Sequence, residues 1–474
     1  MRRFISNPLL WSGVLAAVLI SLVQHNPFFW DTISQASRRS SWFFGEGWGT
    51  ILLPYEMDSG HPTGFNLYLA GVWKLFGRSL VASHWAMLPI VWGIIYQIHY
   101  LVEHYFSAPH RIWAKLLVLT DVTLLAQATL VAPDLVILLG YLLGIRGIFF
   151  RKSGWIILGS TLMVSVSLRG IFCLAALGLS HVFYHYLVVN KKVLTSPRIW
   201  WSIIQPFLPA ILLLIGFNAW HFLQTGWILN TPNPAWAGHR ELLSIKGAMR
   251  NVGIIGWRLL DFGRWAYWLV FGTALWLWWR NKPSILPTLK SLLLWPGIFL
   301  VVLSTAMILL SNPITHRYFL PALISLTFLG AFIVLEHWKT KRRWWVYTFL
   351  LLSQLSGHCW IYPPQVAQAW DASLAYLPYF HLKEEAVDFA YTNQIPLDSI
   401  TSEFPAVGPL DWTTLNEKTE GFVYRDENSP FLFYTTVMND FADKELAQMA
   451  KWPIVWEESY WGHRAVIYER KINH

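Results

Sequence analysis

Residues 8–31 read PLLWSGVLAAVLISLVQHNPFFWD, and this stretch sets the fold class of the chain. The part from Pro8 to Val23 is apolar and follows the basic pair Arg2-Arg3, and no small-residue cleavage site comes after it. We therefore predict an uncleaved first membrane span whose N-terminus lies in the cytoplasm. An acidic residue, Asp31, comes directly after the aromatic residues that close this segment.

Similar apolar runs recur along the chain, and each is roughly long enough to cross a bilayer. They cover residues 81–101, 112–131, 135–150, 155–172, 173–189, 203–222, 264–279, 292–310, 318–335 and 344–361. Together with the first run they predict an all-α polytopic membrane bundle of about eleven transmembrane helices. The pair across 155–189 is the least regular, because it surrounds Arg169-Gly170.

The composition supports a membrane protein and excludes other classes. The 474-residue chain is 55% hydrophobic and only 13% charged, whereas soluble domains carry about 25% charged residues. Its net charge of +9 does not indicate a nucleic-acid partner, because Lys and Arg lie mostly in short clusters between apolar runs. The two cysteines, Cys173 and Cys359, make neither a disulfide framework nor a metal quartet.

Lys and Arg cluster in every second loop, which orients the bundle by the positive-inside rule. The loops with these clusters are expected in the cytoplasm, and they lie at 104–115, 146–152, 191–198, 280–290 and 339–343. Two of the intervening outer loops are long. Residues 26–80 are expected to hold an interfacial or re-entrant helix over 62–77, and residues 223–263 lead into an amphipathic helix over 241–264.

After about residue 360 acidic residues become frequent and long apolar runs stop. The pattern predicts helices and strands of a small α/β domain: helices over 383–393 and 443–451, strands over 399–404 and 430–437, and a hairpin over 456–469. We therefore expect a transmembrane module over 1–361 and a second domain over 362–474. Because an odd number of spans precedes it, this domain is expected on the extracytoplasmic side of the cell membrane.

Several charged residues fall in the expected outer loops. Because the chain has so few charges, charged residues close to the membrane are functional candidates. They are Asp31, Asp58, His61, Asp134, Arg169 and Arg317. Transfer from a phosphate-linked donor to a hydroxyl needs a carboxylate that takes the proton and positive charge at the departing phosphate. Arginine suits the second task, because its planar fork binds phosphate oxygens in pairs.

Each of these residues also has a structural interpretation, and for His61, which precedes Pro62, it is a residue at the start of a helix. Asp31 could cap a surface helix, and Asp134 could partner a helix dipole. Arg317 could pair with lipid phosphate, and Asp58 fits a solvated loop charge. Arg169 fits a helix-breaking residue and a donor contact equally well.

One acid lies inside a predicted span. Asp121 is a functional candidate by its position, although its neighbours Thr120 and Thr123 could satisfy its hydrogen bonds.

The sequence contains no Gly-rich phosphate loop, Cys-x-x-Cys pair or nucleophile elbow, which argues against nucleotide-driven transport and serine hydrolase chemistry.

The first outer loop carries a longer motif, Asp58-Ser59-Gly60-His61-Pro62-Thr63-Gly64-Phe65, followed by Lys74-Leu75-Phe76-Gly77-Arg78. It resembles the first-loop motif of the GT-C membrane glycosyltransferases, in the branch of protein O-mannosyltransferases and lipid A aminoarabinose transferases. Three more features are similar to that branch: Asp31 after the first span, the Pro133-Asp134 pair that opens a span, and His316-Arg317-Tyr318 before a late span. The resemblance covers the N-terminal third well and the rest in layout.

The resemblance implies roles for individual residues. Asp31 is expected to be the acceptor-activating base, and Asp134 a second-loop acid that supports the site or a metal. His61 is expected near the donor phosphate and Arg317 on the leaving group. Substrate contacts are also expected from Asp58, Arg169 and Tyr318.

The sequence departs from the family pattern at two positions. Asp31 is followed by Thr32 where the family often has Asp-Glu, which weakens the argument for a pair of acids or a metal. Thr63 replaces the second Pro of the first-loop motif, which affects only how the interfacial helix begins.

The function implied is a GT-C-type membrane glycosyltransferase that uses a polyprenyl-phosphate sugar donor. The acceptor is a hydroxyl of a lipid, a glycan or a protein, and no cofactor is established, although a divalent cation stays open. One alternative is a non-enzymatic flippase or transporter of lipid-linked sugar, which should show paired halves or broken helices at matching positions; no such symmetry is visible. Another is a related glycan polymerase or ligase.

Overall fold

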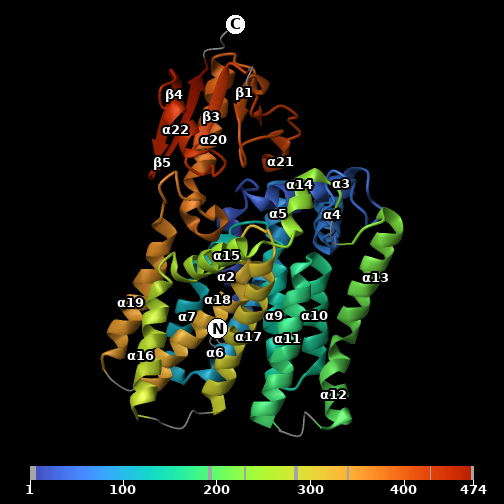
Figure 1. Ribbon diagram of the computed structural model, residues 1–474, viewed down its shortest axis with the longest axis vertical. Helices are drawn as coiled ribbons and strands as arrows, with labels where there is room; N and C mark the ends of the chain where they lie inside the picture. The colour runs from blue at the N-terminus through green and yellow to red at the C-terminus, as the bar shows by residue number, and fades with distance from the viewer. Residues whose placement is uncertain are drawn as a thin grey trace.

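The structure is a computed structural model that describes residues 7–189, 195–228, 231–281, 287–338, 341–426 and 429–470. A bundle of long helices forms most of the molecule, and a small sheet domain near the C-terminus covers one end of it (Figure 1). Short helices lie between the bundle and the sheet domain, at the end of the bundle that we call the capped end (Figure 1).

The bundle helices occur where apolar runs predict them. They are α2 (Pro8–Val23), α5 (Leu80–Ala86), α6 (Leu88–Tyr105), α7 (Arg111–Leu119), α8 (Val122–Ala128), α9 (Asp134–Phe149), α10 (Ser153–Val166), α11 (Arg169–Tyr184), α12 (Pro197–Ile204), α13 (Leu208–Thr225), α16 (Trp265–Asn281), α17 (Pro287–Leu309), α18 (Leu320–Phe332) and α19 (Arg343–Ser356).

Five continuous helical stretches are long and apolar enough, by length and composition, to cross a membrane: Leu80–Tyr105, Arg169–Val189, Pro197–Thr225, Thr288–Leu309 and His316–His337. Shorter apolar helices are Pro8–Val23 and Ser153–Val166. The chain is therefore a multi-pass membrane protein, and the number of eleven spans is not confirmed. An 18-residue window of the stretch His316–His337 is 94% buried within the molecule, so this stretch lies at the centre of the bundle.

Three predicted spans are wrong in their bounds. The run at 112–131 is not one helix, because the chain breaks after α7 and Asp121 caps α8 by accepting hydrogen bonds from the Thr123 and Leu124 amides. The runs at 155–172 and 173–189 divide at Ser167 and Leu168, so Arg169 begins α11 instead of lying inside a helix.

Helices α9 and α10 approach closely through glycine. A Cβ atom on Gly140 would lie 2.5 Å from the Gly159 carbonyl oxygen, and one on Gly159 would lie 2.2 Å from the Gly140 carbonyl oxygen. Small residues at such crossings let membrane helices pack backbone against backbone. This contact fixes α9, whose first residue is Asp134.

The short helices at the capped end include α3 (Arg39–Gly45), α4 (Gly64–Phe76) and α15 (Ile245–Leu260). Helix α4 coincides with the interfacial helix expected over 62–77, and α15 with the amphipathic helix expected over 241–264. Both lie beside the bundle end that faces the sheet domain (Figure 1).

The sheet has five strands in the order β2-β1-β3-β5-β4. They are β1 (Ile400–Ser402), β2 (Val423–Tyr424), β3 (Phe431–Thr435), β4 (Ile454–Tyr460) and β5 (His463–Glu469). Strand β1 is parallel to β2 and β3, whereas β3, β5 and β4 are antiparallel. The hairpin turns at Trp461 and Gly462, both of which have positive φ, as short hairpin turns require.

Helices α20 (Pro378–Thr392) and α22 (Asp443–Met449) complete this domain and bury an apolar core with the sheet. The preceding residues belong instead to the bundle surface. Gln127 donates to the Asp371 carbonyl at 2.8 Å, and the Thr129 and Tyr376 hydroxyls lie 2.7 Å apart. The segment between α19 and α20 therefore crosses the capped end and carries Asp371 onto it.

Candidate active site

Arg317 is the centre of a charged cluster at the capped end. It lies in the turn His316–Phe319 that leads into α18, and its side chain is only 4% exposed. The guanidinium hydrogen-bonds to Asp31 through Nη2 and to Asp371 through Nη1, and its Nε lies 3.7 Å from Asp134 Oδ2. A buried arginine is tolerable only when such partners compensate its lost hydration.

Asp134 and Arg169 form a second pair beside this cluster. Asp134 begins α9 and Arg169 begins α11, and Arg169 Nη1 lies 2.6 Å from Asp134 Oδ1. A helix N-terminus favours an acid and disfavours a cation. Asp134 therefore suits its position, whereas Arg169 needs Asp134 and the Tyr318 ring, whose centroid lies 4.0 Å from its guanidinium carbon.

Asp31 differs from the other acids in its exposure. Its side chain is 40% exposed, compared with 7% for Asp134 and 2% for Asp371. It follows Trp30, whose φ of 54° is in the left-handed region. Strain of this kind at a non-glycine residue is held by surrounding contacts and is common at functional sites. Asp31 is the acid of this cluster that a substrate can reach most easily.

These side chains surround a small cavity of about 50 Å³. It is lined by Asp31, Thr32, Gln35, His61, Pro133, Asp134, Val166, Ser167, Arg169, Arg317 and Tyr318. A cavity of this size holds about one or two waters. It is therefore a charged centre that a sugar phosphate could enter only after the surrounding loops move.

His61 faces this cavity as a neutral imidazole. Its Nδ1 accepts a hydrogen bond from the Leu168 amide at 3.1 Å, so the proton belongs on Nε2. Burial, together with the positive charges of Arg39, Arg240 and Arg169, holds the pKa of His61 well below its usual range. The ring can therefore donate a hydrogen bond from Nε2 without carrying charge.

Six of the seven residues singled out in the sequence line the cavity, and Asp58 does not. Asp58 is buried, so it is not the solvated loop charge that one interpretation expected. Its carboxylate lies 2.8 Å from His221 Nε2 on α13 and accepts from the Gly60 amide at 2.7 Å. Asp58 ties the first outer loop to α13 and thereby fixes the turn before His61.

Asp371 is the site residue that sequence reasoning missed. Burial raises its pKa to about 6, although Arg317 opposes the rise. Its Oδ1 and the Arg317 Nε are buried and make no hydrogen bond to a described residue. The available signal was an acid in an apolar and aromatic segment, Ala369-Trp370-Asp371-Ala372, just after the last apolar run.

Asp121 has the structural role that its neighbours suggested. Its Oδ1 accepts from Arg264 Nη2 at 3.2 Å, and its Oδ2 lies 3.3 Å from the Thr327 hydroxyl. Arg264 also donates to Thr123 at 2.8 Å. This buried network joins α8, α16 and α18 and does not line the charged cavity.

Metal binding remains an expectation from the sequence. Among the residues that the structure describes, no group of three or more His, Cys, Asp and Glu side chains is arranged to hold a metal ion. In the cavity the positive charge next to the acids comes from Arg169 and Arg317.

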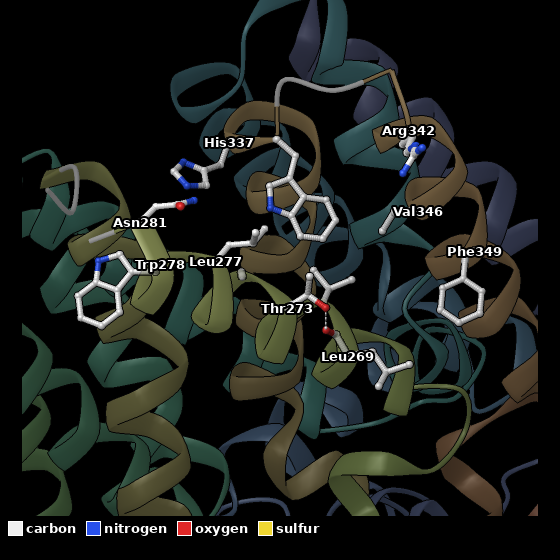
Figure 2. A pocket seen from close by; sticks show the side chains of 12 residues that line it. Leu269, Thr273, Leu277, Trp278, Asn281, His337, Arg342, Val346 and Phe349 are labelled. Carbon is white, nitrogen blue, oxygen red and sulfur yellow. Dashed lines mark hydrogen bonds between the residues drawn. The ribbon is translucent and has the colours of Figure 1, made fainter. Parts of the chain in front are cut away.

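A larger cavity, of about 650 Å³, lies between α16 and α19. Figure 2 shows its apolar walls, with Leu269, Leu277 and Phe349 among them, and its polar end at Asn281, His337 and Arg342. Asn281 ends α16 at the side of the bundle away from the sheet domain (Figure 1). None of the predicted site residues lines this cavity, so it is separate from the charged centre.

No family pattern and no curated protein sequence matches this chain at a significant level. Its fold does match a solved one. The crystal structure of ArnT from Cupriavidus metallidurans bound to undecaprenyl phosphate matches with a TM-score of 0.54, over 96% of this chain and 97% of that one, at 13% identity. The apo structure of the same protein matches with a TM-score of 0.49 at 11% identity.

At 13% identity the match shows a shared fold, and that fold agrees with the resemblance that the first-loop motif indicated. The shared fold covers nearly the whole chain, including the sheet domain, whereas the sequence resemblance covers the N-terminal third well.

Proposed function

We propose that this chain is a membrane glycosyltransferase that moves a sugar from a polyprenyl-phosphate donor to a hydroxyl of a lipid, glycan or protein acceptor. The ArnT-like fold supports the enzyme class, and the solved neighbour is bound to undecaprenyl phosphate. The proposal puts the capped end, with its charged cavity, on the extracytoplasmic side, because the loops rich in Lys and Arg are expected in the cytoplasm.

One observation carries the proposal: a partly exposed carboxylate, Asp31, is paired with a buried arginine, Arg317, at a cavity that also holds Arg169. A base must reach its substrate, and a phosphate site must keep its positive charge out of water, where electrostatic interactions are stronger. The exposures of 40% for Asp31 and 4% for Arg317 match these two requirements.

The chemistry assigns one step to each group. Asp31 takes the proton of the acceptor hydroxyl while the hydroxyl oxygen forms a bond to the anomeric carbon. The bond from that carbon to the phosphate oxygen breaks, and the polyprenyl phosphate leaves with the bonding electrons, so the anomeric configuration inverts. Arg317 and Arg169 stabilise the phosphate, and His61 donates a hydrogen bond from Nε2.

The ion pair between Asp31 and Arg317 suggests how donor binding prepares the base. A donor phosphate competes with Asp31 for the Arg317 guanidinium, so binding of the donor releases the carboxylate. The acceptor hydroxyl then meets a free base. In this proposal the compact cavity is the resting form, and the donor opens it.

The test uses the full chain, purified and placed in liposomes with a radiolabelled polyprenyl-phosphate sugar and an extract of envelope acceptors. The proposal expects label to move to an acceptor and free polyprenyl phosphate to appear in equal amount. Label that only crosses the bilayer unchanged would contradict the proposal and establish a flippase. Repeating the assay with a chelator tests the divalent cation that the sequence left open.

A further inference from the structure

A separate cavity of about 430 Å³ lies between the bundle and the C-terminal domain. One wall is the segment 25–28 that follows α2, another is α20, and a third is the loop 410–418. Phe28 and Thr413 join two of these walls, because the Phe28 amide donates to the Thr413 carbonyl at 2.8 Å. The cavity is thus built by both parts of the molecule.

Lys383 on α20 lines this cavity as a buried cation without a partner. The residue is 8% exposed, and no hydrogen bond or ion pair joins its ammonium to any residue that the structure describes. Glu384 and Asp388 line the same cavity but form no ion pair with it. Burial of an unpaired ammonium is costly, and here burial lowers the pKa of Lys383 to about 8.

Further donors line the same space. Lys418 lies over the Tyr391 ring, 4.7 Å from its centroid, and donates to the Tyr391 hydroxyl at 3.3 Å. His25 and Asn416 line the cavity as well. The Lys383 side chain is mostly buried and its ammonium opens to this cavity, so an anion held there, with Lys418 on the same lining, would complete its contacts.

We propose that this cavity binds a phosphate group, with Lys383 as the buried counter-charge and Lys418 on its exposed side. The phosphate is either free or part of a lipid headgroup, since both present the same oxygens to the ammonium. The site is distinct from the charged cluster around Arg317. It borders the segment that reaches Asp31 three residues after Phe28, a distance of at most about 11 Å.

The test measures binding of inorganic phosphate to the full chain in dodecyl maltoside micelles, which contain no phosphate, by calorimetry. Lys383→Met keeps the length and the apolar stem of the side chain, and it should weaken phosphate binding by about 10- to 100-fold, since hydrogen bonds to charged groups contribute that much. Lys444→Met, which removes an exposed lysine on α22, should leave binding unchanged. A thermal unfolding curve for each variant shows that it is folded.

Arg317→Lys separates the two possible anion sites. Phosphate binding that survives Lys383→Met and is lost in Arg317→Lys would place the anion in the charged cluster and overturn the proposal. Absence of phosphate binding in the unaltered chain would also overturn it. In micelles that contain phosphatidylglycerol, weaker apparent phosphate binding would identify a lipid headgroup as the occupant, and unchanged binding would identify free phosphate. This test needs no sugar transfer, so it can fail without affecting the proposed function.

Discussion

At the scale of single residues, the proposed site depends on one guanidinium shared by several acids. Arg317 contacts Asp31 and Asp371 and lies near Asp134. Only a planar fork with several N–H groups can serve partners in these different directions. Lysine at this position keeps the positive charge but presents it on a single ammonium nitrogen. It therefore cannot contact both the acids of the resting form and a donor phosphate.

We therefore expect Arg317→Lys to lower kcat/KM for the donor by about 100-fold or more, which is the loss typical of one preorganised charge-stabilising donor. The measurement is the initial rate of sugar transfer at several donor concentrations. Arg425→Lys, at a half-exposed ion pair with Glu403 and Glu445, is the matched control and should leave the rate unchanged. Equal rates in Arg317→Lys and the unaltered chain would remove Arg317 from the phosphate site.

Asp371 should make donor binding depend on pH. Its pKa of about 6 lies above the ordinary value, so it is largely neutral below pH 6 and ionised above it. The ionised carboxylate competes with the donor phosphate for Arg317, so donor affinity should fall as the pH rises from 5 to 7. A phosphodiester donor has no titration of its own in this range.

Asp371→Asn should abolish this dependence and leave the donor KM low and flat between pH 5 and 7. The readout is the donor KM at each pH, with thermal unfolding as the check on folding. A step near pH 6 that persists in Asp371→Asn would belong to another group, and Asp371 would then not be the acid that competes with the donor.

At the scale of elements, helix ends bring the charged groups together. Asp134 and Arg169 each begin a helix, and the Arg317 turn leads into a third. The apolar runs predicted where most of these helices lie, because a run of about twenty apolar residues has few stable structures other than a membrane-spanning helix. They placed the boundary between two spans at 172–173, whereas the helices divide at Ser167 and Leu168, next to the irregular pair Arg169-Gly170.

The α9–α10 crossing offers a test at this scale. Gly159→Ala would drive a methyl group into the Gly140 carbonyl, so the helices must separate and the Tm should fall by several degrees. Gly154→Ala, on the same helix with no atom within 4 Å of the added carbon, should be neutral or slightly stabilising. The comparison is thermal unfolding in one detergent. Equal Tm values for the two variants would show that the close approach does not hold the helices.

At the scale of the whole molecule, the sheet domain is attached to the first outer loop. Arg78 forms two hydrogen bonds with Asp411, of 2.8 and 2.5 Å, and Arg38 lies over the Trp412 ring, 3.9 Å from its centroid. Phe29 stacks on Tyr376 with centroids 4.4 Å apart. These contacts hold the segment that carries Asp31 between the bundle and the domain.

Arg78→Ala should loosen this attachment without unfolding the bundle. We expect faster hydrogen exchange at the Phe28 amide, whose acceptor is the Thr413 carbonyl, and a lower transfer rate. Exchange in peptides from α9 should stay unchanged and serves as the internal control. Unaltered exchange around residue 28 would mean that the ion pair does not position the Asp31 segment.

The same scale shows what the sequence could and could not predict. The bundle, the interfacial helices and the sheet follow from local hydropathy and alternation. The site follows only in part: Asp31, Asp134 and Arg317 stood out because charges near a membrane are rare. Asp371 was missed because its importance comes from contacts with residues far away in sequence, such as Gln127 and Arg317. Asp58 does not line the cavity, since its carboxylate lies against His221, and the motif shows which residues are present but not where they point.

The most direct test of the proposed mechanism is the single-turnover rate of sugar transfer by Asp31→Asn, with donor binding measured on the same preparation. We predict that the rate falls by about 1,000-fold or more, because a neutral amide cannot accept the proton. Donor binding should be kept or strengthened, since Arg317 loses a competing acid. Glu46→Gln, an exposed acid in the same loop, should behave like the unaltered chain. Transfer by Asp31→Asn at the unaltered rate would contradict the assignment of Asp31 as the base.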